Sequence, residues 1–124
     1  MTTARTVVSI VDDDESVRES LPDLLNEMGF AVQVFSSAEE FLASDFAGRT
    51  NCLILDVAMP GMSGPELQAE LKIRRQRIPI VFITGQKDDK VRPSLIAAGA
   101  VECLFKPFSD TALLSALKAA LRVA

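Results

Sequence analysis

Acidic, hydroxyl and amine side chains stand directly after several apolar segments of this sequence. Asp12 and Asp13 follow the first apolar segment, Asp56 follows another, and Thr84 and Lys106 follow two more. Carboxylate oxygens suit a hard divalent cation such as Mg²⁺, whereas an amine and a hydroxyl suit the oxygens of a phosphoryl group. These residue types, once brought together, are typical of a phosphoryl-transfer site.

Asp56 allows two interpretations when it is considered alone. It follows the apolar residues 52–55, where a carboxylate is costly unless it meets a cation, a hydrogen-bond network or solvent. An aspartate at the end of a strand can simply cap the loop that follows it. Alternatively, Asp12, Asp13 and Asp56 meet at one site, where their mutual repulsion favours a bound Mg²⁺ or Mn²⁺ ion.

The chain lacks several features on which other catalytic sites depend. It contains no histidine, which excludes Ser-His and Cys-His catalysis, histidine-ligated zinc and phosphohistidine formation on this chain. It contains no Gly-x-x-x-x-Gly-Lys-Ser/Thr loop, so a P-loop nucleotide site is excluded as well. A carboxylate between a metal ion and a lysine can itself attack a phosphoryl group and form an acyl phosphate. Asp56 is the best-placed candidate for that nucleophile.

The elements that must position these residues alternate between strands and helices. The predicted strands cover residues 6–11, 31–35, 52–55, 78–83 and 101–105. Predicted helices follow each strand, the first over about residues 16–28 and the fourth over about 91–98, and residues 45–51 are expected to form a loop. Capping-box signals start two of the helices: Ser36 or Ser37 with Glu39 or Glu40, and Ser63 with Glu66. Pro22 lies inside the first helix and is expected to bend it.

This alternation predicts an α/β fold in which helices cover both faces of a parallel sheet, because each crossover must be right-handed and helical. The carboxyl ends of the strands in such a sheet lie near one rim, where ligands bind. The acids, Thr84 and Lys106 all stand at the ends of predicted strands, so we expect them to share this rim.

Length and composition are typical of one globular domain. The chain has 124 residues, 48% of them hydrophobic, and a net charge of −4, which argues against direct binding of nucleic acid. No apolar run is long enough to span a membrane, and the first residues lack the apolar core of a secretory signal, so we expect a cytoplasmic protein. Cys52 and Cys103 lie in apolar strand patterns and are interpreted as buried free thiols.

Four motifs of this chain together resemble the signatures of response regulator receiver domains, the chemotaxis-regulator-like family. They are Val11-Asp12-Asp13, Leu55-Asp56-Val57-Ala58-Met59-Pro60-Gly61-Met62-Ser63-Gly64, Ile83-Thr84-Gly85 and Lys106-Pro107-Phe108. Two further segments, Ser37-Ala38-Glu39-Glu40-Phe41-Leu42 and residues 99–108, are most similar to the FixJ-like subgroup, which usually carries a helix-turn-helix output domain. The resemblance implies a flavodoxin-like (βα)5 doubly wound sheet with strand order 2-1-3-4-5. It also implies that residues 1–124 are a receiver domain, either complete or part of a longer transcription regulator.

The resemblance implies a role for each acid at the rim. Asp56 would take a phosphoryl group from the phosphohistidine of a sensor histidine kinase. Asp13, Asp56 and the backbone carbonyl of Ala58 would bind Mg²⁺ directly, and Asp12 would act through a water molecule. The chain is therefore expected to be a signalling phosphoacceptor and not an enzyme that acts on a separate substrate.

The resemblance also implies which residues hold and report the phosphoryl group. Thr84 and Lys106 would contact its oxygens, and the Lys106–Pro107 peptide bond would be cis. Thr84 would then move inward and change the face made by the fourth helix, the fifth strand and the fifth helix, which would dimerise or bind an effector. The family usually has an aromatic switch residue where this chain has Cys103, so the cysteine is interpreted either as a switch position or as simple core filling.

Two other classes of protein remain as alternatives. A haloacid-dehalogenase-like phosphatase also uses an aspartyl nucleophile and Mg²⁺, but it needs a second aspartate two residues later, where this chain has Ala58. A degenerate receiver that serves only as a binding module would lack one of the acids, Thr84 or Lys106, and this chain has them all. Both observations favour the phosphoacceptor.

Overall fold

Five parallel strands form the centre of the computed structural model, which describes residues 5–85 and 90–122. The strands are β1 (Val7–Val11), β2 (Ala31–Phe35), β3 (Cys52–Asp56), β4 (Ile80–Thr84) and β5 (Glu102–Phe105). The helices are α1 (Glu15–Glu27), α2 (Ala38–Ala43), α3 (Gly64–Ile73), α4 (Val91–Ala97) and α5 (Asp110–Arg122), with a short 3₁₀ helix η1 (Asp45–Gly48). The strand order β2-β1-β3-β4-β5 confirms the predicted flavodoxin-like α/β fold. No helix within the described ranges combines the length and the apolar character needed to cross a bilayer.

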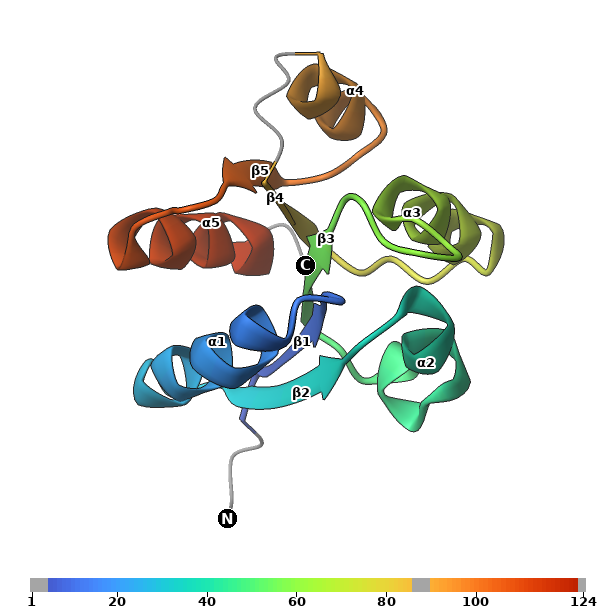
Figure 1. Cartoon of the computed structure of the whole chain (residues 1–124). Coiled ribbons are helices and arrows are strands. Elements are labelled where there is room, and N and C mark those ends of the chain that lie inside the picture. Colours follow the sequence, from blue (N-terminus) through green and yellow to red (C-terminus); the bar gives the residue numbers. More distant parts are fainter. Residues whose placement is uncertain (1–4, 86–89, 123–124) are drawn as a thin grey trace.

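Helices cover both faces of the sheet (Figure 1). α1 and α5 lie on one face, α2 and α3 lie on the other, and α4 lies beside the edge strand β5. Alternate side chains of each strand point to opposite faces, so Leu53 and Leu55 of β3 join the core under α2 and α3, whereas Cys52 and Ile54 join the core under α1 and α5. The central strand is therefore buried on both faces, which explains its uninterrupted apolar sequence.

Side-chain hydrogen bonds stabilise the first turns of several helices, among them α1 and α3. Oδ1 of Asp14 accepts a hydrogen bond from the N–H of Ser16 at 2.9 Å and caps α1. Ser63 and Glu66 form the predicted capping box at the start of α3. α1 continues through Pro22 as one helix, and the bend expected there stays a prediction.

Two predictions of local structure are wrong. The loop expected at residues 45–51 contains η1, whose first turn is stabilised by a hydrogen bond from the N–H of Phe46 to Oγ of Ser44 at 3.2 Å. Strand β4 begins at Ile80, later than the predicted start at residue 78, because Pro79 has no N–H to donate to the sheet. The carbonyl oxygen of Pro79 still accepts a hydrogen bond from Leu53 at 2.9 Å, so the chain is already aligned with β3 there.

Candidate functional site

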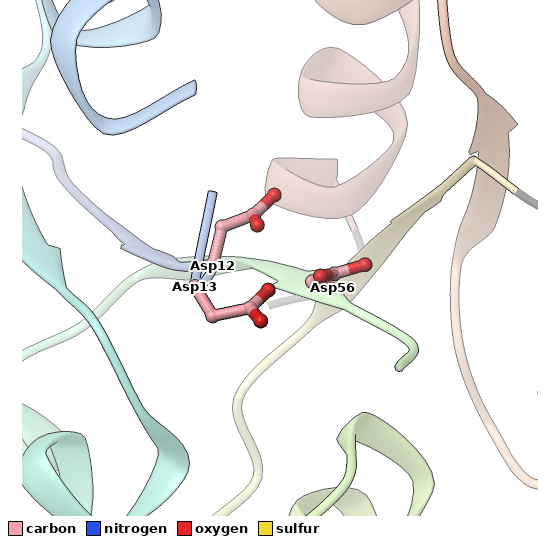
Figure 2. A group of neighbouring side chains, drawn as sticks. All are labelled: Asp12, Asp13 and Asp56. Atoms are coloured by element: carbon pink, nitrogen blue, oxygen red, sulfur yellow. The ribbon is translucent and has the colours of Figure 1, made fainter. Parts of the chain in front are cut away.

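Three carboxylates meet at the carboxyl end of the sheet. β1 and β3 are parallel neighbours with Val11 opposite Leu55, so the residues that follow, Asp12 and Asp56, occupy adjacent positions. Asp13 joins them, and one carboxylate oxygen of each acid lies within 4.8 Å of the others (Figure 2). Asp12 is fully buried and Asp56 is 7% exposed, whereas Asp13 is exposed. The structure thus brings the three predicted acids together.

Lys106 reaches these acids from the end of β5. Its Nζ atom donates to Oδ2 of Asp12 at 3.0 Å, and Oδ1 of Asp12 accepts from the N–H of Asp14 at 2.9 Å. Burial opposes the positive charge of Lys106, but the hydrogen bond and charge of Asp12, with the charges of Asp56 and Asp14, outweigh it and raise the pKa of Lys106. The amine is therefore held in its charged form beside the acids, with Asp12 as its direct partner.

Asp56 titrates unlike an exposed aspartate. Burial, followed by the charge of Asp12, raises the pKa of Asp56 to about 7, although the charge of Lys106 acts in the opposite direction. Near neutral pH the carboxyl group is thus roughly half protonated unless another positive charge is supplied. Three carboxylates around one point, one of them short of a counter-charge, fit a hard divalent cation such as Mg²⁺ or Mn²⁺.

Thr84 and Lys106 stand at the ends of neighbouring strands. Thr84 is the last residue of β4, is 1% exposed and pairs in register with Phe105 of β5. The N–H of Lys106 donates to the carbonyl oxygen of Thr84 at 2.8 Å. The Lys106–Pro107 peptide bond is cis. Both residues therefore lie at the rim that carries the acids.

Hydrogen bonds fix the loop between β3 and α3, which follows Asp56. The N–H of Met62 donates to Oε2 of Glu39 in α2 at 3.0 Å, and the N–H of Gly64 donates to the carbonyl oxygen of Val57 at 2.9 Å. Ala58, whose backbone carbonyl is a predicted metal ligand, lies exposed in this loop. The two ends of the loop are therefore joined to each other, and its middle is tied to α2.

Cys103, the predicted switch position, is part of the core. It is 3% exposed, packs in the cluster under α2 and α3, and is a free thiol like Cys52, as predicted. Burial raises the pKa of the Cys103 thiol, with Arg92 opposing and Glu102 adding to the shift. Arg92 of α4 and Glu102 of β5 also form an ion pair, Nη2 to Oε1, at 2.5 Å. These contacts favour core filling for Cys103, and a switching role stays a prediction.

Sequence reasoning missed two contacts beside the acids. Glu40 makes the capping contacts with Ser36 at the start of α2, whereas Glu39, which shares the same sequence signal, reaches the β3–α3 loop instead. Arg18 of α1 donates through Nη1 to the carbonyl oxygen of Asp12 at 3.0 Å. No sequence signal identifies either contact, because both depend on how α1 and α2 sit against the sheet.

Comparison with known proteins gives consistent matches over nearly the whole chain. The family model described as "Response regulator receiver domain" matches residues 8–118. The response regulator protein TodT of Pseudomonas putida is 44% identical over 124 residues, which cover 100% of this chain and 55% of TodT. The transcriptional regulatory protein FixJ of Rhizobium meliloti is 43% identical over 113 residues, which cover 91% of this chain and 55% of FixJ. The chain thus spans about half the length of these curated relatives.

Solved structures show the same fold. The crystal structure of FixJ-N superposes with a TM-score of 0.87 at 40% identity and covers 98% of each chain. The structure of the response regulator StyR superposes with a TM-score of 0.89 at 46% identity and covers 97% of this chain and 61% of StyR. Both superpositions include the sheet whose rim carries the acids.

Proposed function

The chain belongs to the response regulator receiver domain family, and on that premise we propose that Asp56 is the residue that accepts the phosphoryl group. A receiver domain is the phosphoacceptor of a two-component system. This chain has the acidic pocket of such a domain, formed by Asp12, Asp13 and Asp56. One observation carries the assignment to Asp56: its carboxylate ends the central strand within 4.8 Å of those of Asp12 and Asp13. The charged amine of Lys106 lies at the same rim.

In the proposed reaction, a carboxylate oxygen of Asp56 attacks the phosphorus of a kinase phosphohistidine. The oxygen–phosphorus bond forms as the nitrogen–phosphorus bond breaks, and the imidazole departs. Only the deprotonated carboxylate is a nucleophile, so the raised pKa of Asp56 restrains transfer unless positive charge is supplied. Asp12, Asp13, Asp56 and the carbonyl of Ala58 are proposed to hold a Mg²⁺ or Mn²⁺ ion, which when bound supplies that charge to the acids and to the transferring oxygens.

Lys106 and Thr84 are proposed to hold the phosphoryl oxygens once the group is on Asp56. Lys106 donates to Asp12 at 3.0 Å, and its flexible side chain can exchange this carboxylate for a phosphoryl oxygen at the same rim. Thr84 ends the strand next to β3, so an inward movement of its hydroxyl would pull on the connection to α4. We infer that the face made by α4, β5 and α5 responds and serves for dimerisation or effector binding.

The proposed partners follow from the family and from the lengths of the relatives. A sensor histidine kinase is the proposed phosphoryl donor. Because the chain spans about half of TodT and FixJ, we propose that it works with a helix-turn-helix output domain, fused or separate, in a cytoplasmic transcription regulator. The receiver itself, with a net charge of −4, is proposed to contact proteins and not nucleic acid or membrane.

The two alternative classes are less well supported by this site. A phosphatase of the haloacid-dehalogenase type needs a carboxylate two residues after the nucleophile, and Ala58 occupies that position. A degenerate receiver would lack part of the site, whereas the three acids and Lys106 are close together in this fold. The phosphoacceptor is therefore the function we propose.

Treatment with acetyl phosphate and Mg²⁺, followed by intact mass measurement, tests this proposal. The wild type should gain the mass of one phosphoryl group, and Asp56→Asn should gain none because an amide is a poor nucleophile. Asp45→Asn, which alters an exposed aspartate of η1, is the matched control and should be modified like the wild type. EDTA should abolish the modification. Phosphorylation of Asp56→Asn to the wild-type extent would overturn the assignment.

A further inference from the structure

A cavity of about 730 Å³ lies at the opposite end of the sheet from the acids. It is formed by the C-terminal turn of α3, residues 75–79 that lead into β4, and the turn between α4 and β5. All strands run parallel, so the amino ends of β4 and β5 are separated from the rim by the length of the sheet. The volume is within the range of about 300–1,000 Å³ that is typical of sites for small ligands. The proposed phosphoryl transfer does not use this cavity.

The cavity combines positive charge with apolar surface. Lys72, Arg75 and Arg77 line it, and no carboxylate is among its described lining residues, although the whole chain has a net charge of −4. Ile78, Pro79 and Val101 also line it and are part-exposed, so they supply apolar surface. A concave apolar surface with cations along it suits an anion that has an apolar body.

Two of the three cations form no ion pair within the part of the chain that the structure describes. Nζ of Lys72 donates to the carbonyl oxygen of Ala98, at the end of α4. Neither Arg75 nor Arg77 forms an ion pair within residues 5–85 and 90–122. Solvated arginines are common on protein surfaces, but the backbone of Arg75 sets it apart from them.

Arg75 has a backbone conformation that arginine rarely adopts. Its φ is 58°, in the turn that ends α3, where the N–H of Gln76 donates to the carbonyl oxygen of Leu71 at 2.9 Å. Glycine is the usual residue at such a turn, because a side chain disfavours the left-handed region. An arginine kept in a disfavoured conformation, where glycine would cost less, is a candidate for a role of its guanidinium group. Gln76 also lines the cavity, although its Oε1 atom is buried and accepts no hydrogen bond from any described residue.

We propose that this cavity binds a small organic acid that carries one carboxylate and an apolar body. The carboxylate pairs with Arg75 and Arg77, whose guanidinium groups suit bidentate contact. The apolar body covers the part-exposed side chains of Ile78 and Val101. This binding is independent of the proposed phosphoryl transfer.

Titration with para-hydroxycinnamate, followed through backbone amide NMR shifts, tests the proposal. The wild type should show saturable shifts at Leu71, Ile80 and Val101, with a Kd in the low millimolar range or below. The methyl ester of the same compound lacks the charge and should bind about tenfold more weakly or worse. The absence of saturable shifts up to about 10 mM, or equal binding of the ester, would overturn the proposal.

Single substitutions distinguish specific binding by Arg75 and Arg77 from a nonspecific effect of net charge. Arg75→Gly removes the guanidinium and places the preferred residue at a φ of 58°, so it should fold at least as stably while weakening binding about fivefold or more. Arg77→Gln should weaken binding by a similar factor. Arg74→Gln is the matched control, because Arg74 pairs with Glu70 at 3.4 Å and does not line the cavity. Equal weakening by Arg74→Gln would indicate a nonspecific charge effect and would also overturn the proposal.

Discussion

Replacing Asp56 with asparagine should stabilise the metal-free protein at neutral and higher pH. Burial first, and the charge of Asp12 second, raise the pKa of Asp56 in the folded state to about 7. The unfolded chain has an ordinary aspartate pKa of about 4, so the folded state binds this proton more tightly. Stability should therefore fall as pH rises from about 4 to about 7 and stay constant above that. Asparagine has no such proton to lose.

The size of the effect follows from the difference between the two pKa values. About three pKa units at about 1.4 kcal/mol each give a ceiling of about 4 kcal/mol. The pKa of about 7 already includes the charge of Lys106, but solvent at the open side of the rim screens part of the remaining effect, so we expect about 2–4 kcal/mol between wild type and Asp56→Asn above pH 7. The electrostatic part of the difference should disappear below about pH 3, where the carboxyl group is protonated in both states.

Urea unfolding in EDTA, followed by circular dichroism, measures this effect. The chain has no tryptophan or tyrosine to give a fluorescence signal, and no histidine to titrate between about pH 5 and pH 8. The pH dependence in that window should therefore report mainly on Asp56. Asp45→Asn alters an exposed aspartate and should run parallel to the wild type. A difference between wild type and Asp56→Asn that stays the same from about pH 5 to pH 8 would refute the electrostatic reasoning.

Two further substitutions test the loop that follows Asp56. Gly64→Ala should cost about 2–4 kcal/mol in urea unfolding, because its Cβ would lie 2.2 Å from the carbonyl oxygen of Asp56, and an unchanged midpoint would contradict the close approach. Glu39→Ala should weaken Mg²⁺ binding about fivefold in calorimetric titration, because the N–H of Met62 loses its acceptor and the loop is no longer held from α2. Glu40→Ala, which removes only capping contacts, should leave that affinity unchanged, and equal losses in the two variants would refute the positioning role.

The α/β class of the fold and most of the rim could be predicted from local sequence patterns, whereas the strand order was predicted only from the resemblance to receiver domains. An apolar run such as residues 52–55 indicates a strand buried on both faces, and β3 is buried along its whole length. Alternation with helices makes the strands parallel, and parallel strands end at one edge. The positions of Asp12, Asp56 and Thr84 at one rim then follow from the end of each strand, without any knowledge of distances.

The contacts between those side chains were decided only by the packed structure. Lys106 donates to Asp12, 94 positions away, although sequence reasoning had no basis for preferring Asp12 over Asp56 as its partner. Glu39 contacts Met62 across 23 positions, whereas the neighbouring glutamate supplies the helix cap. Local propensity acts over a few residues, but contacts between distant side chains depend on the strand register and on the position of each helix against the sheet. The register and the helix positions are set by close packing of the two hydrophobic cores on the faces of the sheet.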